Sequence, residues 1–141
     1  AWTVLKAKLL LHVLVTAVPA VIFIVSISVV LGISPVEAVL VGLFELIFIV
    51  LGAAVGLAVN LKMPNLNWVN ETVVIKQSMA VMIAIFGSWL EVLALGGLYF
   101  LLRKLMTPMS YLVLAIIIIA AAACLLLLWL RKKGTKIFAE L

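Results

Sequence analysis

The sequence predicts an all-α membrane protein with four transmembrane helices in two antiparallel hairpins and with both termini in the cytoplasm. Of its 141 residues, 69% are hydrophobic and only 11% are charged. The mean hydropathy is +1.49. Soluble domains are about half apolar and about a quarter charged. The composition therefore excludes a water-soluble domain and a disordered chain. At about 20 apolar residues per span, it leaves room for four or five spans.

Turn residues divide the chain into four spans within a single transmembrane domain, residues 1–141. We expect the spans at about residues 9–31, 35–59, 77–102 and 109–130, with a cytoplasmic loop at 60–76. Pro35 suits a first helical turn, where its missing N–H costs no hydrogen bond. The turn before Pro35 is so short that the first two spans must run antiparallel. Residues 131–134 predict the end of the fourth span, and a short surface tail follows.

The distribution of lysine and arginine predicts the orientation in the membrane. Arg103 and Lys104 fall on one side of the predicted bundle, and the cations that share the other side are Lys6, Lys8, Lys62, Lys76, Arg131, Lys132, Lys133 and Lys136. Short cytoplasmic loops carry the excess of Lys and Arg in membrane proteins. We therefore expect a multi-pass protein of the inner or plasma membrane. The net charge of +5 reflects this topology, so the lipid bilayer rather than nucleic acid is the expected partner.

Two acidic residues are predicted to lie inside the membrane. Glu45 is ten residues into the second span, and Glu91 is twelve residues before Arg103 in the third. At a rise of 1.5 Å per residue, both carboxyls lie roughly 15–18 Å from the outer end. An ionised acid at that depth is costly and usually faces a partner or a water path. The pair is either a proton or substrate contact, or two protonated or hydrogen-bonded acids that hold helices together.

The remaining distinctive residues have simpler interpretations. His12, one turn after Lys8, could titrate near neutral pH but is interpreted as a solvated side chain at the interface. Gly52 and Gly56 form a small-xxx-small pattern, which predicts close packing of two helices. The sequence contains no phosphate-binding loop, metal-ligand cluster or Ser-His-Asp set. We therefore expect no enzymatic activity, no cofactor and no metal site.

The stretch after the second span resembles a known family. It reads Asn-Leu-Lys-Met-Pro at residues 60–64, Asn-Trp at 67–68, Asn-Glu at 70–71 and Ile-Lys-Gln at 75–77, and it follows a glycine-rich span. This pattern is similar to one found in bacterial ABC-type exporter permeases of the type-2 exporter class. The resemblance implies a helical membrane subunit that pairs with a separate ATP-binding subunit and with a second permease copy or half. Because such permeases are usually much longer, it also implies that this chain is the C-terminal part of one.

The same stretch could serve as a docking surface for a partner. Pro64 and the asparagines would fix its shape, and Trp68 would anchor it. Its polar candidates for partner contact are Lys62, Asn70, Glu71 and Lys76. Trp68 could equally well rest among the lipid headgroups.

Three hypotheses follow from the sequence. The first is a permease subunit of an ATP-driven exporter, and the second is a small proton-coupled transporter that uses Glu45 or Glu91. The third is a membrane scaffold subunit that transports nothing.

Overall fold

The structure is a computed structural model that describes residues 1–64 and 79–140. Within these ranges the chain is helical, and four helices are long and apolar enough to cross a membrane. The prediction of an all-α protein with four spanning helices is therefore confirmed. The helices are α1 (Trp2–Leu31), α2 (Pro35–Lys62), α4 (Met79–Leu102) and α5 (Pro108–Trp129), and α5 continues through the π-helix η1 (Leu130–Gly134) into α6 (Thr135–Glu140).

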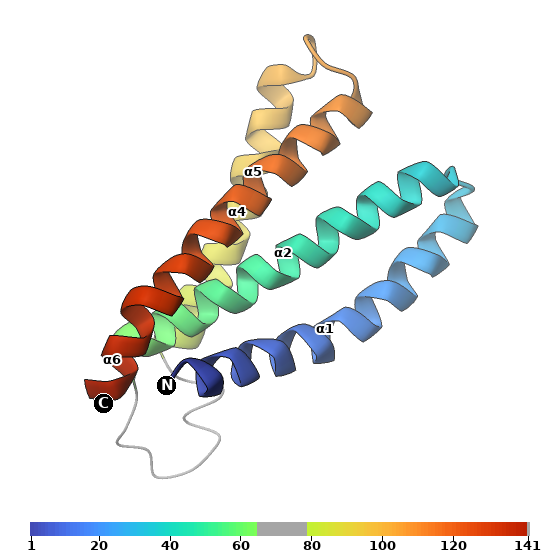
Figure 1. Ribbon diagram of the computed structural model, residues 1–141. Coiled ribbons are helices and arrows are strands. Elements are labelled where there is room, and N and C mark those ends of the chain that lie inside the picture. Colours follow the sequence, from blue (N-terminus) through green and yellow to red (C-terminus); the bar gives the residue numbers. More distant parts are fainter. Residues whose placement is uncertain (65–78, 141) are drawn as a thin grey trace.

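Helix α2 is the centre of the arrangement. It contacts α1, α4, α5, η1 and α6, whereas α4 and α5 make few contacts with each other. Figure 1 shows the two chain termini at one end of the molecule and the turns that follow α1 and α4 at the other. Toward the turns, the α1–α2 pair and the α4–α5 pair diverge (Figure 1).

The turn from α1 to α2 is defined by one glycine and one capping box. Gly32 adopts a left-handed conformation (φ 63°) and ends α1, with its N–H bonded to the Ser28 carbonyl. A side chain in this conformation would be strained, so glycine is favoured. Ser34 then caps α2: its backbone N–H donates to Glu37 Oε2 at 2.9 Å, and the Glu37 N–H donates to Ser34 Oγ at 3.3 Å. This reciprocal pair satisfies two amide donors at the helix start.

Helices α4 and α5 are joined by tyrosines near their turn. The Tyr111 hydroxyl of α5 donates to the Leu95 carbonyl of α4. The rings of Tyr99 and Tyr111 lie 5.1 Å apart between centroids. Thr107 caps α5 through the Ser110 N–H, and Pro108 occupies its first turn.

A cluster of buried side chains lies at the end that holds the termini. Its members, Leu5, Ala54, Leu61 and Leu130, come from α1, α2 and η1. It explains why two helices run beyond the predicted spans: α1 begins at Trp2 rather than near residue 9, and α2 ends at Lys62 rather than near residue 59. Leu5 is only 1% exposed and Leu61 only 5%, so the extra turns bury apolar surface.

The predicted helix end at residues 131–134 is wrong. The chain stays helical through Gly134 and on to Glu140, where a surface tail was expected. Gly134 is buried, and a Cβ placed on it would lie 3.2 Å from both Leu61 and Leu130 side-chain carbons. The glycine therefore permits close packing of η1 on the end of α2 and does not terminate the helix.

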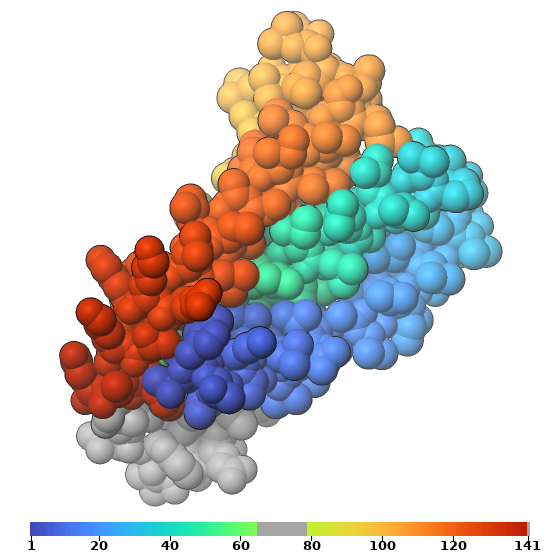
Figure 2. Space-filling view, viewed as in Figure 1, coloured from blue at the N-terminus to red at the C-terminus, as the bar shows by residue number. Residues whose placement is uncertain are grey.

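Most large apolar side chains face outward along all four long helices. Val29, Leu90 and Leu101, for example, are each more than two-thirds exposed. In the view of Figure 2, the helices themselves form the surface of the molecule, and no further layer covers them. Such a surface needs lipid or protein around it, which agrees with a multi-pass membrane protein.

Candidate functional site

A groove opens between α1, α2 and α4 near the end that holds the termini. Its larger part has a volume of about 360 Å³. Three of its lining residues are polar: His12 of α1, Asn60 of α2 and Ser88 of α4. The other lining residues that the structure describes are small or aliphatic: Gly52, Gly56, Ala80, Val81, Ala84 and Ile85.

A smaller pocket of about 200 Å³ adjoins it on the side of α1. It shares His12, Gly56 and Asn60 with the larger one and adds Lys8. We call the two pockets together the His12 groove. The smaller pocket brings together the Lys8 ammonium group, the His12 imidazole and the Asn60 amide.

Helical spacing explains how α2 and α4 each contribute one face to the groove. On α2, residues 52, 56 and 60 recur every four positions and therefore lie on one face. On α4, residues 80, 84 and 88 do the same. The side chains on these faces are mostly small, so the helices leave a hollow rather than a packed seam.

Gly52 and Gly56 do not act as the sequence suggested. A Cβ placed on either glycine would meet no described atom within 4 Å. A glycine of α2 that does face a neighbouring helix is Gly42, where a Cβ would lie 3.6 Å from Ile24 Cδ1 of α1. The two glycines instead form the floor of the His12 groove.

The two intramembrane acids lie beyond the groove rather than in it. Neither Glu45 nor Glu91 lines its described surface, and both are half-buried. Glu91 is three residues past Ser88 and Glu45 is seven before Gly52, so each shares the groove-facing side of its helix. The Oε2 atom of Glu91 is buried and has no hydrogen-bond partner.

The predicted docking residues are only partly within the described ranges. Lys62 is the last residue of α2, and its Nζ lies 5.4 Å from the centroid of the Trp129 ring. Pro64 is half-buried just after the helix. Trp68, Asn70, Glu71 and Lys76 lie outside the described residues.

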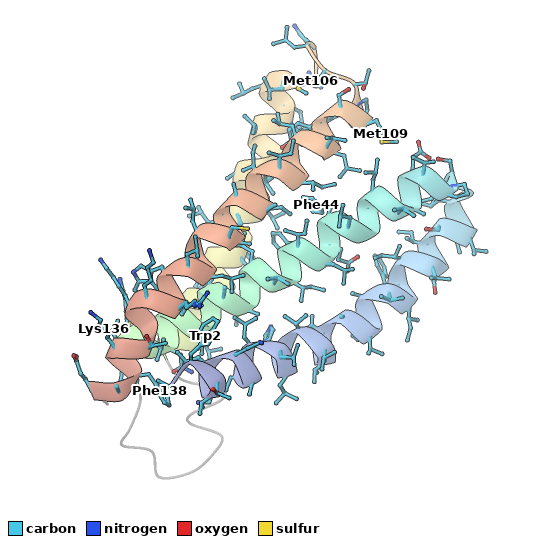
Figure 3. The ribbon with its side chains drawn as sticks, viewed as in Figure 1. Trp2, Phe44, Met106, Met109, Lys136 and Phe138 are labelled. Atoms are coloured by element: carbon cyan, nitrogen blue, oxygen red, sulfur yellow. The ribbon has the colours of Figure 1, made fainter. Side chains whose placement is uncertain are left out.

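Positive charge is concentrated at the end of the molecule that holds the termini and the smaller pocket. The described cations there are Lys6, Lys8, Lys62, Arg131, Lys132, Lys133 and Lys136, and the one described acid among them is Glu140. We call this the basic end of the molecule. Aromatic rings cover part of it: Lys8 Nζ lies 6.0 Å from the Phe138 ring centroid, and Figure 3 shows Trp2, Lys136 and Phe138 at this end.

Two further observations limit what the site can do. No group of three or more His, Cys, Asp or Glu that could hold a metal exists among the described residues. A larger hollow of about 600 Å³ lies along α4, from Met79 to Leu93, but its lining is almost entirely apolar. Among the described residues, the His12 groove combines polar side chains with a hollow between helices.

Comparisons with known proteins identify no relative. No protein-family model, curated protein or solved structure matches this chain.

Proposed function

We propose that the chain is a transmembrane permease subunit, or part of one, of an ATP-driven exporter that works with a separate ATP-binding subunit. The observation that carries the proposal is the sequence of residues 60–77, with its Pro64, Trp68 and Asn70-Glu71 pattern. This stretch links α2 to α4, two helices with the length and composition of membrane spans. A chain of this kind would bind no nucleotide itself.

The packing at the basic end suits a subunit that receives force from a partner. Leu61 at the end of α2 packs with Leu130 of η1, and Lys62 lies over the ring of Trp129, the last residue of α5. A partner that displaces this end would therefore move α2 and α5 together. Nucleotide binding by that partner would shift the population of helix arrangements, provided that it binds one arrangement more tightly.

The first experiment is purification of the tagged chain from its native membranes in mild detergent, with its companions identified by mass spectrometry. We expect a stoichiometric ATP-binding subunit, or a longer polypeptide that contains these residues. A species of 15.3 kDa that binds only to itself would contradict the proposal.

A tryptophan pair tests the docking surface. Trp68→Ala should remove the ATP-binding subunit from the purified material. Trp89→Ala is the matched control, because Trp89 is 66% exposed on α4 and is not part of the sequence stretch 60–77. A partner retained equally by both variants would refute the docking role of Trp68 and leave the permease proposal standing.

One observation favours a second candidate, the proton-coupled transporter. The Oε2 atom of Glu91 is buried without a hydrogen-bond partner, and Glu91 lies one turn past Ser88, which lines the groove. For the chain reconstituted in liposomes with a trapped pH-sensitive dye, this candidate predicts proton uptake that Glu91→Gln or Glu45→Gln abolishes. Glu140→Gln, at the exposed end of α6, is the control. Unchanged uptake in both intramembrane variants would reject this candidate, and absence of both a partner and proton uptake would favour the scaffold hypothesis.

A further inference from the structure

The chemistry of the His12 groove is amphipathic, and this limits the ligands that fit it. Lys8, His12 and Asn60 stand at one end, and the walls formed by Gly52, Ala84 and Ile85 are apolar. The Ser88 hydroxyl at the far end already donates to the Ala84 carbonyl at 3.0 Å. It therefore adds little polarity to the wall, and the ligand needs one polar end and one apolar end.

The charge of the groove specifies the polar end of that ligand. Lys8 belongs to the basic end, where Glu140 is the one described acid. An ammonium group beside an imidazole and an amide offers hydrogen-bond donors to an anion. Basic pockets between transmembrane helices commonly hold anionic lipid headgroups.

The position of the groove indicates where the apolar end of the ligand would lie. Asn60 lies in the last turn of α2, whereas Ser88 lies nine residues into α4, or roughly 13 Å along its axis. The groove therefore runs from a helix end toward the membrane interior. The volume of about 360 Å³ in its larger part is that of a typical ligand pocket.

We propose that the His12 groove binds one anionic phospholipid, with its phosphate at Lys8, His12 and Asn60 and an acyl chain between α2 and α4. The site does not depend on the exporter proposal, since it rests on α1, α2 and α4 alone. It differs from the general lipid surface because it combines a charged end with an apolar hollow between helices.

The test uses the full chain, purified in detergent and stripped of lipid. Native mass spectrometry and thermal melting are recorded with added phosphatidylglycerol, phosphatidylcholine, glycerol 3-phosphate or inorganic phosphate. We expect phosphatidylglycerol alone to add one retained lipid and to raise the melting temperature, because a ligand that binds only the folded state stabilises it. An equal shift with glycerol 3-phosphate or inorganic phosphate would overturn the lipid assignment in favour of a soluble anion.

Two groove variants and one charge-matched control locate the site. The double variant Lys8→Ala/His12→Ala should bind phosphatidylglycerol on the order of tenfold more weakly, as expected for lost contacts to an anionic headgroup. The double variant Lys132→Ala/Lys133→Ala removes exposed charge at the same end but outside the groove, and it should bind as the wild type does. Equal loss in both double variants would overturn the proposal, since it would indicate attraction to the basic end as a whole.

Gly56→Leu tests the groove by filling it. Gly56 lines both pockets, and a Cβ there meets no described atom within 4 Å, so the variant should fold. We expect its melting temperature without lipid to equal that of the wild type and its retained phosphatidylglycerol to be lost. Wild-type retention in Gly56→Leu would overturn the proposal independently of the charge variants.

Discussion

Gly134 shows how one missing side chain can decide the path of a helix. The sequence alone suggested a helix end, because glycine often follows the last helical turn. In the structure Gly134 is helical and buried, and its place against Leu61 leaves no room for a Cβ without movement of a neighbour. A sequence pattern could not reveal this, since the contact joins residues more than seventy positions apart.

The first prediction concerns this glycine. Gly134→Val should destabilise the protein by roughly 1–3 kcal/mol, the usual cost of overpacking a tight core. Gly97→Val is the matched control, because a Cβ on Gly97 meets no described atom within 4 Å. Thermal melting in detergent compares the two. Equal melting temperatures would show that η1 does not need the close approach to α2.

His12 illustrates a functional candidate that the sequence undervalued. The one sequence feature that pointed to His12 was Lys8, one helical turn away. A lysine at that position indicated only the membrane–water interface. Asn60 and Ser88 reach the same groove from other helices, and their convergence depends on how α1 and α4 rotate about α2. Hydropathy indicates that a helix spans the membrane but says little about which of its faces packs against the other helices. The groove therefore could not be predicted from the sequence.

At the scale of single elements, helix starts marked by proline were easier to predict than helix ends that depend on tertiary packing. Pro35 and Pro108 both occupy first turns in the structure, as Pro35 was expected to do. The lengths of α1 and α2 were underestimated because the extra turns are held by Leu5 and Leu61, whose burial depends on tertiary contacts.

A second prediction tests the capping box between α1 and α2. Ser34→Ala removes the side chain that accepts from the Glu37 N–H and should cost about 1 kcal/mol of stability. Ser26→Ala is the control, because the Ser26 hydroxyl bonds only within its own helix, to the Ile22 carbonyl at 2.8 Å. The comparison is made by unfolding in detergent. A loss of stability confined to Ser26→Ala would contradict the capping role of Ser34.

A third prediction tests the tyrosine link between α4 and α5. Tyr111→Phe removes the hydroxyl that donates to the Leu95 carbonyl and should cost about 0.6 kcal/mol, the average for hydrogen bonds between membrane helices. Tyr99→Phe retains the ring contact with Tyr111 and should cost less. Equilibrium unfolding in mixed micelles measures both. A loss in Tyr111→Phe no larger than that in Tyr99→Phe would show that the Tyr111 hydroxyl does not stabilise the contact between the helices.

At the scale of the whole molecule, composition alone was enough to predict the class of fold. A chain that is 69% hydrophobic cannot hide its apolar groups in a core of this size, and the structure leaves most of them outward. The side of the membrane on which the termini lie stays a prediction from charge.

The fourth prediction tests that orientation. In a Cys124→Ala background, Lys132→Cys should react with an impermeant maleimide only from the cytoplasmic side, and Lys104→Cys only from the opposite side. Both lysines are exposed, at opposite ends of the described helices. Labelling of intact cells and of inverted membranes separates the sides. Reversed labelling would place the basic end outside the cell.

The central place of α2 has a consequence for biogenesis. Its surface receives α1 on one side and α5 and α4 on others, so the two halves of the chain recognise each other mainly through α2. That recognition uses side chains such as Leu51 and Ile119, which are buried against one another from α2 and α5. Because these contacts lie within the described helices, a gene divided between α2 and α4 should still encode two polypeptides that meet and complement each other in the membrane.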